Sequence, residues 1–272
     1  MILTSDFTHI SSFSFYSAVC LVPLYLIYAF LGGKLKGSLV LGWIVLLWSL
    51  HGLNVLSTLI DMDENGPRFG FAPALSATAW LIFTCYALER HWFPQSRVRW
   101  GVACVGLLTV VLSVYFPGQT LKLNASAWLP LHWALGMASY GLFGAAVVHA
   151  LILSHSEKLM RQAAQSSAGL PLLTLERLTY RFVISGFVLL TSTLLAGFLF
   201  GESLFGAGHT WRWDHKSVLS VLAWITFALL LLARYHHGWR GQKAIRVIYL
   251  GSGLLFLAYA GSHFVREVIL RR

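Results

Sequence analysis

The residues best suited to binding chemistry lie in one short polar segment between two long apolar runs. The segment combines two tryptophans with acidic, basic and imidazole side chains, namely Trp211, Arg212, Trp213, Asp214, His215 and Lys216. Tryptophans also scatter around membrane proteins where these meet water. Two of them at positions i and i+2, however, form a flat aromatic surface beside charged groups. Such a surface suits a planar apolar macrocycle, so we consider haem, whose iron accepts neutral imidazoles and whose propionates Arg212 or Lys216 can bind.

Four of the eleven histidines are candidates for binding such a ligand. His51 lies 13 residues into an apolar run, near the middle of a membrane-spanning segment, where a polar ring needs a partner inside the protein. That partner is either a ligand or a neighbouring helix. His132, His215 and His263 lie near the ends of other runs, on the side of the tryptophan segment. We take His132 and His263 as the first candidates for iron ligands.

The remaining chemically active residue types carry weaker signals. Five histidines lie at or near the opposite ends of the runs, where we interpret them as solvated by the interface: His91, His149, His155, His236 and His237. All ten acidic residues fall at helix ends or in loops, which argues against a proton relay through carboxylates. The three cysteines form no CxxC pair, which gives no support to covalent haem attachment. No pairing of a nucleophile with a base is present, so we do not expect an enzyme.

The elements that must position these residues are apolar helices. Of the 272 residues, 57% are hydrophobic and only 11% are charged, against about 25% charged in soluble domains. This composition excludes an ordinary soluble enzyme and a nucleic-acid-binding domain. Because about 20 apolar residues cross a bilayer as a helix, we predict one all-α membrane domain over residues 1–272. Its eight spans are predicted at about 12–32, 38–60, 71–90, 98–116, 128–153, 179–201, 216–235 and 244–265, with an outer tryptophan-rich loop at 202–216.

The distribution of basic residues predicts the orientation of these spans. Alternate loops hold 13 of the 20 lysines and arginines, whereas the other side balances seven basic with seven acidic residues. The basic side is expected to be cytoplasmic, so both termini and the tryptophan segment lie outside. No basic residue precedes Lys34, and a cleavable signal needs one before its apolar core. We therefore expect the first span to remain in the mature protein.

The sequence resembles the cytochrome c assembly superfamily, the haem-handling membrane proteins of the CcsA, CcmC and CcmF type. Trp211-Arg-Trp213-Asp214 is similar to the tryptophan-rich WWD signature of that superfamily. The resemblance covers nearly the whole chain, most specifically residues 128–272. It includes Glu176-Arg177-Leu-Thr-Tyr180-Arg181 before the signature, and Trp224 and Arg234 after it. The turn at 235–241 and the ending at 259–265 resemble the shorter YpjD/HemX-type branch.

The resemblance implies roles for individual histidines. CcsA-like proteins have an external histidine before the signature, which His132 matches, and an intramembrane histidine that corresponds to His51. The second intramembrane histidine falls on Leu232 here, with His236 four residues further on. The second external histidine belongs to a tail segment without a counterpart in this sequence, for which His263 or His215 can substitute.

The resemblance also implies a function and partners. It implies a haem-binding protein of a bacterial inner membrane that presents b-type haem at the outer face during cytochrome c assembly. CcsB-like or thioredoxin-like partners would then complete the assembly. A regulatory or scaffolding protein that keeps the fold without haem, as in HemX-type relatives, is the alternative. A small-molecule transporter is a third and weaker alternative, because the predicted span interiors hold no carboxylates that could relay protons.

Overall fold

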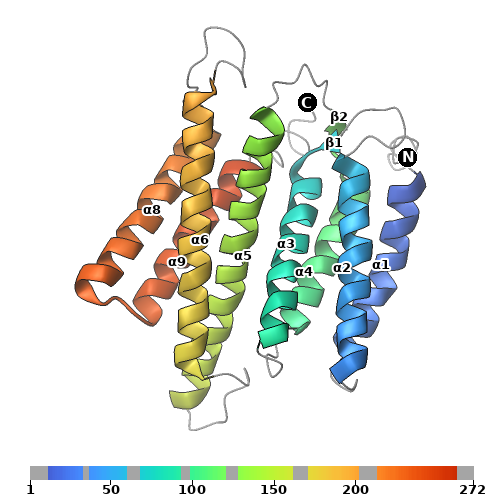
Figure 1. Ribbon diagram of the computed structural model, residues 1–272, viewed down its shortest axis with the longest axis horizontal. Coiled ribbons are helices and arrows are strands. Elements are labelled where there is room, and N and C mark those ends of the chain that lie inside the picture. The colour runs from blue at the N-terminus through green and yellow to red at the C-terminus, as the bar shows by residue number, and fades with distance from the viewer. Residues whose placement is uncertain are drawn as a thin grey trace, which may run out of the picture.

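The chain folds into a bundle of long, roughly parallel and antiparallel helices (Figure 1). The computed structural model describes residues 12–32, 37–59, 68–92, 99–120, 128–161, 171–201 and 213–261. Its helices are α1 (Ser12–Leu31), α2 (Gly37–Leu59), α3 (Phe71–Trp92), α4 (Arg99–Tyr115), α5 (Trp128–Arg161), α6 (Leu172–Leu199), α8 (His215–His237) and α9 (Gln242–Phe256). A π-helical turn, η2 (Leu257–Gly261), continues α9. The predicted all-α fold class is confirmed.

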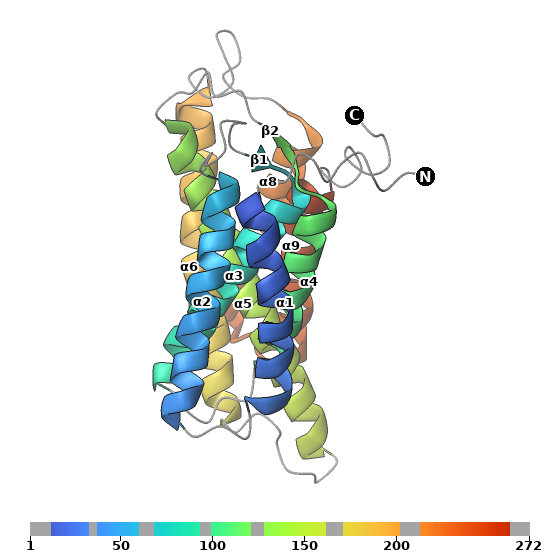
Figure 2. The same cartoon turned by 90° about the vertical axis from the view of Figure 1, so that its right-hand side faces the viewer.

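The lengths and composition of the helices fit a polytopic membrane protein. In the described ranges, six helices are long and apolar enough to cross a membrane, and two shorter apolar helices, Phe15–Leu31 and Arg99–Tyr115, run alongside them (Figure 2). The largest departures from the predicted ranges are at the basic end, where α5 runs on to residue 161 and α6 begins at residue 172. Charged residues in these turns lower the local hydropathy, but they do not interrupt a helix.

One short antiparallel ladder joins two connections at the opposite end of the bundle. Strand β1 (Arg68–Phe69) pairs with β2 (Gln119–Thr120), with Arg68 opposite Thr120 and Phe69 opposite Gln119. We call this end the outer end, following the orientation predicted from the basic loops. Helices α3, α5 and α8 all begin there.

The bundle consists of two halves, each with its own hydrophobic core. Helices α1 to α4 enclose one core around side chains such as Leu21, Tyr25 and Phe83. Helices α5, α6, α8 and α9 enclose the other, in which the rings of Phe143 and Phe227 stack 3.9 Å apart. The halves lie side by side and meet mainly where α3 packs against α5 (Figure 1).

Glycines allow α3 and α5 to approach closely. A Cβ atom added to Gly141 of α5 would lie 2.5 Å from the Cβ atom of Leu81. One added to Gly144 would lie 2.5 Å from the Cδ1 atom of Ile82. Both distances are shorter than packed carbon atoms tolerate. The contact between the two halves therefore depends on the absence of side chains at these two positions.

Gly141→Ala is expected to destabilise the protein by about 1–3 kcal/mol, because the added methyl group overpacks the contact with Leu81. Gly101→Ala on α4 is the matched control, since nothing lies within 4 Å of the added carbon there. Thermal unfolding in detergent measures both variants. An unchanged melting temperature for Gly141→Ala would contradict the role given to this contact.

Candidate functional site

A cavity of about 770 Å³ lies between the two halves of the bundle. Helices α3, α4, α5, α6, α8 and α9 and the turn η2 all contribute to its walls. Its size falls within the usual range for small-molecule sites. Most lining side chains are apolar. A cluster of polar side chains lies where α5 and α8 begin and consists of His132, Asp214, Lys216, Ser217 and Ser220. The cavity thus brings together His132 and Asp214, which are far apart in the sequence.

His132 lines the cavity and has a buried ring nitrogen. The backbone carbonyl of Thr193 on α6 interacts with the ring. Its Nδ1 atom is buried and has no hydrogen-bond partner among the described residues. A neutral imidazole can ligate a metal through either of its ring nitrogens. The arrangement therefore fits an axial ligand of iron.

Asp214 caps the N-terminus of α8. Its Oδ1 atom accepts a hydrogen bond of 2.9 Å from the backbone N–H of Ser217. Partial burial acts to raise the pKa of the Asp214 carboxyl, but hydrogen bonds from Ser217 and the charges of Lys216 and His215 outweigh it. The pKa therefore lies below its ordinary value. The Lys216 ammonium lies 5.6 Å from the centre of the Tyr259 ring, at the same mouth of the cavity.

The rest of the tryptophan segment is not gathered around the cavity in the described residues. Trp213 is 73% exposed, His215 is also exposed, and neither lines the cavity. The sequence-based predictions for Trp211, Arg212 and His263 lie outside the described residues. The flat shelf of two tryptophans thus stays a prediction.

His51 belongs to the core of the first half. It is fully buried, its Nδ1 atom lies 2.6 Å from the Tyr25 hydroxyl, and its Nε2 atom lies 2.9 Å from the Ser76 hydroxyl. In this arrangement both ring nitrogens have partners on neighbouring helices. His51 is also absent from the cavity lining. The position matches the structural alternative of the sequence analysis, in which the ring is held by adjacent helices.

A buried acid–imidazole pair joins α3 and α5 and was missed from the sequence. The Nε2 atom of His149 lies 2.6 Å from the Oε2 atom of Glu89, and the two side chains are 3% and 2% exposed. The Nδ1–H of His149 donates to the Ala145 carbonyl at 2.8 Å. Nε2 must then share a proton with the carboxyl group. The other carboxyl oxygen, Oε1, has no partner in the part of the chain that the structure describes.

The interpretation of His149 as solvated at the interface was therefore wrong. The reason is the length of α5, which extends past the predicted end at residue 153 and keeps His149 inside the bundle. Glu89 is near the end of α3, as its sequence position indicated, but α5 covers its side chain. No signal in the sequence alone distinguishes this burial from an exposed helix end.

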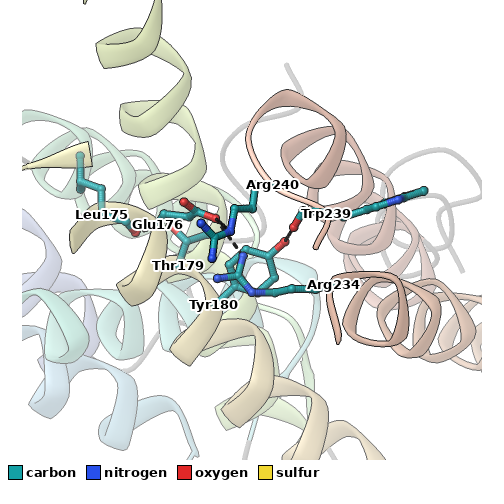
Figure 3. Close-up of polar contacts among 7 residues, drawn as sticks. All are labelled: Leu175, Glu176, Thr179, Tyr180, Arg234, Trp239 and Arg240. Carbon is teal, nitrogen blue, oxygen red and sulfur yellow. Dashed lines mark hydrogen bonds and ion pairs between the residues drawn. The ribbon is translucent and has the colours of Figure 1, made fainter. Parts of the chain in front are cut away.

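A second polar cluster fixes the turn between α8 and α9 to α6 (Figure 3). The Arg234 guanidinium lies 3.3 Å from the centre of the Tyr180 ring and donates to Glu176 at 2.9 Å. The Tyr180 hydroxyl donates to the backbone carbonyl of Trp239 at 3.1 Å. Gly238, with φ of 63°, ends α8 in the left-handed conformation that glycine favours. The cluster explains structurally why Glu176, Tyr180 and Arg234 occur together.

In the part of the chain that the structure describes, the chemically active side chains are dispersed. No group of three or more His, Cys, Asp or Glu residues is close enough to hold a metal ion within the described ranges.

Glu89→Leu is expected to destabilise the protein by about 1–3 kcal/mol, because the buried Nε2 atom of His149 loses its partner. Glu89→Gln is the matched variant, since its amide can donate to Nε2 and should recover most of the loss. Thermal unfolding in detergent compares the two. Equal losses for both variants would contradict the proposed pairing.

Asp214→Ala is expected to lower the free energy of unfolding by about 1 kcal/mol at neutral pH, because the helix cap is lost. Asp214→Asn should lower it less, because asparagine also caps helices. Folding lowers the carboxyl pKa, so its stabilisation is complete above the ordinary value of 3.8 and is lost as the pH falls through the lower folded value. The difference between the parent and Asp214→Ala should therefore shrink below about pH 4. Unfolding measured from pH 7 to pH 3 tests this, and a difference that grows with acidification would contradict it.

Comparison with known proteins identifies relatives over most of the chain. The chain is 30% identical to the inner membrane protein YpjD of Escherichia coli over 226 residues, which cover 80% of this chain and 83% of that protein. It is 23% identical over 257 residues to the cytochrome c biogenesis protein CcsA of Prochlorococcus marinus, covering 81% and 80% of the two chains. It is 36% identical to CcsA of Cyanophora paradoxa over 95 residues, which cover 35% of this chain and 29% of that protein.

No solved structure matches the chain. The family model for the cytochrome C assembly protein matches residues 38–270, which run from the second residue of α2 past the end of α9 and include the cavity and the Glu89–His149 pair. The match confirms the superfamily that the tryptophan-containing segment and its flanking residues indicated. With its bundle of apolar helices, the chain is a multi-pass membrane protein that belongs to the cytochrome c assembly protein family.

Proposed function

We propose that this protein binds b-type haem at the outer mouth of its cavity and takes part in cytochrome c assembly in a bacterial inner membrane. The observation that carries the proposal is the buried Nδ1 atom of His132, which lines the cavity and has no hydrogen-bond partner among the described residues. Bound haem supplies an iron that accepts this imidazole. The residues present at the mouth therefore fit the group.

The other residues at the mouth fit the periphery of haem. Lys216 provides a cation for a propionate, and the hydroxyl groups of Ser217 and Ser220 line the same polar end. Trp211 and Trp213 are proposed to cover the exposed side of the macrocycle, with Arg212 as a further partner for carboxylates. His215 or His263 is the proposed second axial ligand.

In this proposal the protein holds and presents haem, and it makes or breaks no covalent bond. Attachment of haem to a cytochrome then requires partner proteins, for which CcsB-like or thioredoxin-like subunits are proposed. Two relatives named as cytochrome c biogenesis proteins support this role.

A regulatory or scaffolding protein without haem is the second candidate. The observation that favours it is the His51 ring, whose two nitrogens already have protein partners. A haem iron would have to displace Tyr25 or Ser76 to reach this ring.

His132→Ala is expected to lower the affinity for haemin by at least about tenfold, because the iron loses a ligand. The purified protein is titrated with haemin in detergent, and the Soret band and a pyridine haemochrome assay give haem per chain. His155→Ala is the control, since His155 is exposed and lies near the basic end of α5.

Equal haem affinity and equal spectra for the parent and both variants would remove His132 from the proposal. No haem binding by the parent would favour the scaffold.

A further inference from the structure

The cavity is longer than haem binding at its mouth requires. Its lining on α5 extends from His132 to Leu151, a distance of about 28 Å along the helix axis at 1.5 Å per residue. The hydrocarbon core of a bilayer is about 30 Å thick. The cavity therefore continues from the outer mouth through most of the membrane-spanning part of the bundle.

Two hydroxyl groups in the deeper part of the cavity lack hydrogen-bond partners. The Oη atom of Tyr249 and the Oγ atom of Ser252 are both buried and unpaired within the described residues, and both residues line the cavity. They are three residues apart on α9 and so lie on the same face of that helix. Buried unpaired donors are uncommon in folded proteins and point to a missing partner.

The depth of these hydroxyl groups restricts the chemistry of that partner. Ser252 lies ten residues after the start of α9, about 15 Å along the helix and close to the middle of the hydrocarbon region. Among the residues that the structure describes, the only charged ones that line the cavity, Asp214 and Lys216, are at the outer mouth. A ligand held at mid-membrane depth must therefore be uncharged and must accept hydrogen bonds.

The cavity also reaches the lateral surface of the bundle at this depth. Gly253 of α9, which directly follows Ser252 in the sequence, and Phe256, which lies one turn beyond it, line the cavity and are exposed, Phe256 by 52%. In a membrane the surrounding medium at that depth is hydrocarbon. A ligand can therefore enter sideways from the bilayer and leave an apolar chain in the opening.

We infer that the deeper part of the cavity is a binding site for a neutral, carbonyl-bearing prenyl lipid of the quinone class. Tyr249 and Ser252 donate hydrogen bonds to a carbonyl oxygen of the head group, and the chain runs out past Gly253. Ester carbonyls of phospholipids lie at the membrane interface, and fatty acids and haem carry carboxylates, so these molecules fit the hydroxyl pair less well. The inference does not depend on haem binding at the mouth.

The first test measures neutral lipids that remain bound to the detergent-purified protein. Organic extracts analysed by mass spectrometry should contain about one quinone per chain. Gly253→Phe should reduce this amount by at least about tenfold, because the phenylalanine side chain would occupy open space in the cavity. Nothing lies within 4 Å of a Cβ atom added to Gly253, which lines the cavity. Gly42→Phe on α2 is the control, since it has equally open surroundings and lies outside the cavity. A quinone content that is the same in both variants would overturn the proposal.

The second test removes only the two hydroxyl groups. In quinone-free nanodiscs, the parent is titrated with a dimethoxybenzoquinone and with a naphthoquinone, each carrying a decyl chain. The double variant Tyr249→Phe/Ser252→Ala should bind the preferred probe about tenfold more weakly, as expected for the loss of two neutral hydrogen bonds. Tyr235→Phe/Ser192→Ala is the control, because Tyr235 is 84% exposed and Ser192 bonds within its own helix.

The two probes represent two classes of quinone, and binding of either one supports the proposed site. Two results would overturn the proposal. One is that neither probe binds. The other is that the molecules lost from the extract of Gly253→Phe are only phospholipid, fatty acid or haem. Haemin titration of His132→Ala is independent of these measurements, so loss of the haem proposal leaves the quinone result interpretable.

Discussion

The close contact between α3 and α5 determines the shape of the whole molecule. Two four-helix halves have separate cores, and Gly141 and Gly144 let the two halves approach along this one line. Packing between helices in a membrane relies on such small residues, because burial away from lipid provides little hydrophobic gain. Where α3 and α5 meet, the bundle is dense. Beside this contact the halves leave a cavity, whose walls include α4 and α9 and also Ile82 and Gly144 of the contact itself.

Hydrocarbon offers no hydrogen bonds, so polar groups in the interior need partners within the protein. His51 is satisfied by Tyr25 and Ser76, and His149 by Glu89 and the Ala145 carbonyl. These side chains tie neighbouring helices together, which is the usual role of polar residues inside a helical membrane protein. Their partners come from the chain itself, so these two histidines act as structural residues in this arrangement.

The lining of the cavity departs from that rule at a few atoms. Nδ1 of His132, Oη of Tyr249 and Oγ of Ser252 are buried without partners in the described part of the chain. They occur at two depths, and the chemistry differs between them. The outer mouth combines an imidazole with a cation and a carboxylate, which fits an iron macrocycle with carboxylates. The deeper hydroxyl groups are remote from any charge in the lining, which fits a neutral acceptor. One elongated cavity therefore presents two chemically distinct polar regions.

The sequence by itself determined the helices, the family and two residues of the cavity mouth. Apolar runs of about 20 residues have few alternatives to membrane-spanning helices, so the helix positions and the all-α class followed directly. His132 and Asp214 were also selected from the sequence, because polar residue types beside apolar runs are conspicuous. The tertiary structure decided which of the candidates share a space. It placed His132 and Asp214 at one cavity, left His51 in the opposite core, and buried Glu89 against His149. Hydropathy reports the depth of a residue in the membrane but not the neighbour that it faces, because that neighbour depends on how each helix is rotated and on how far the adjacent helix extends.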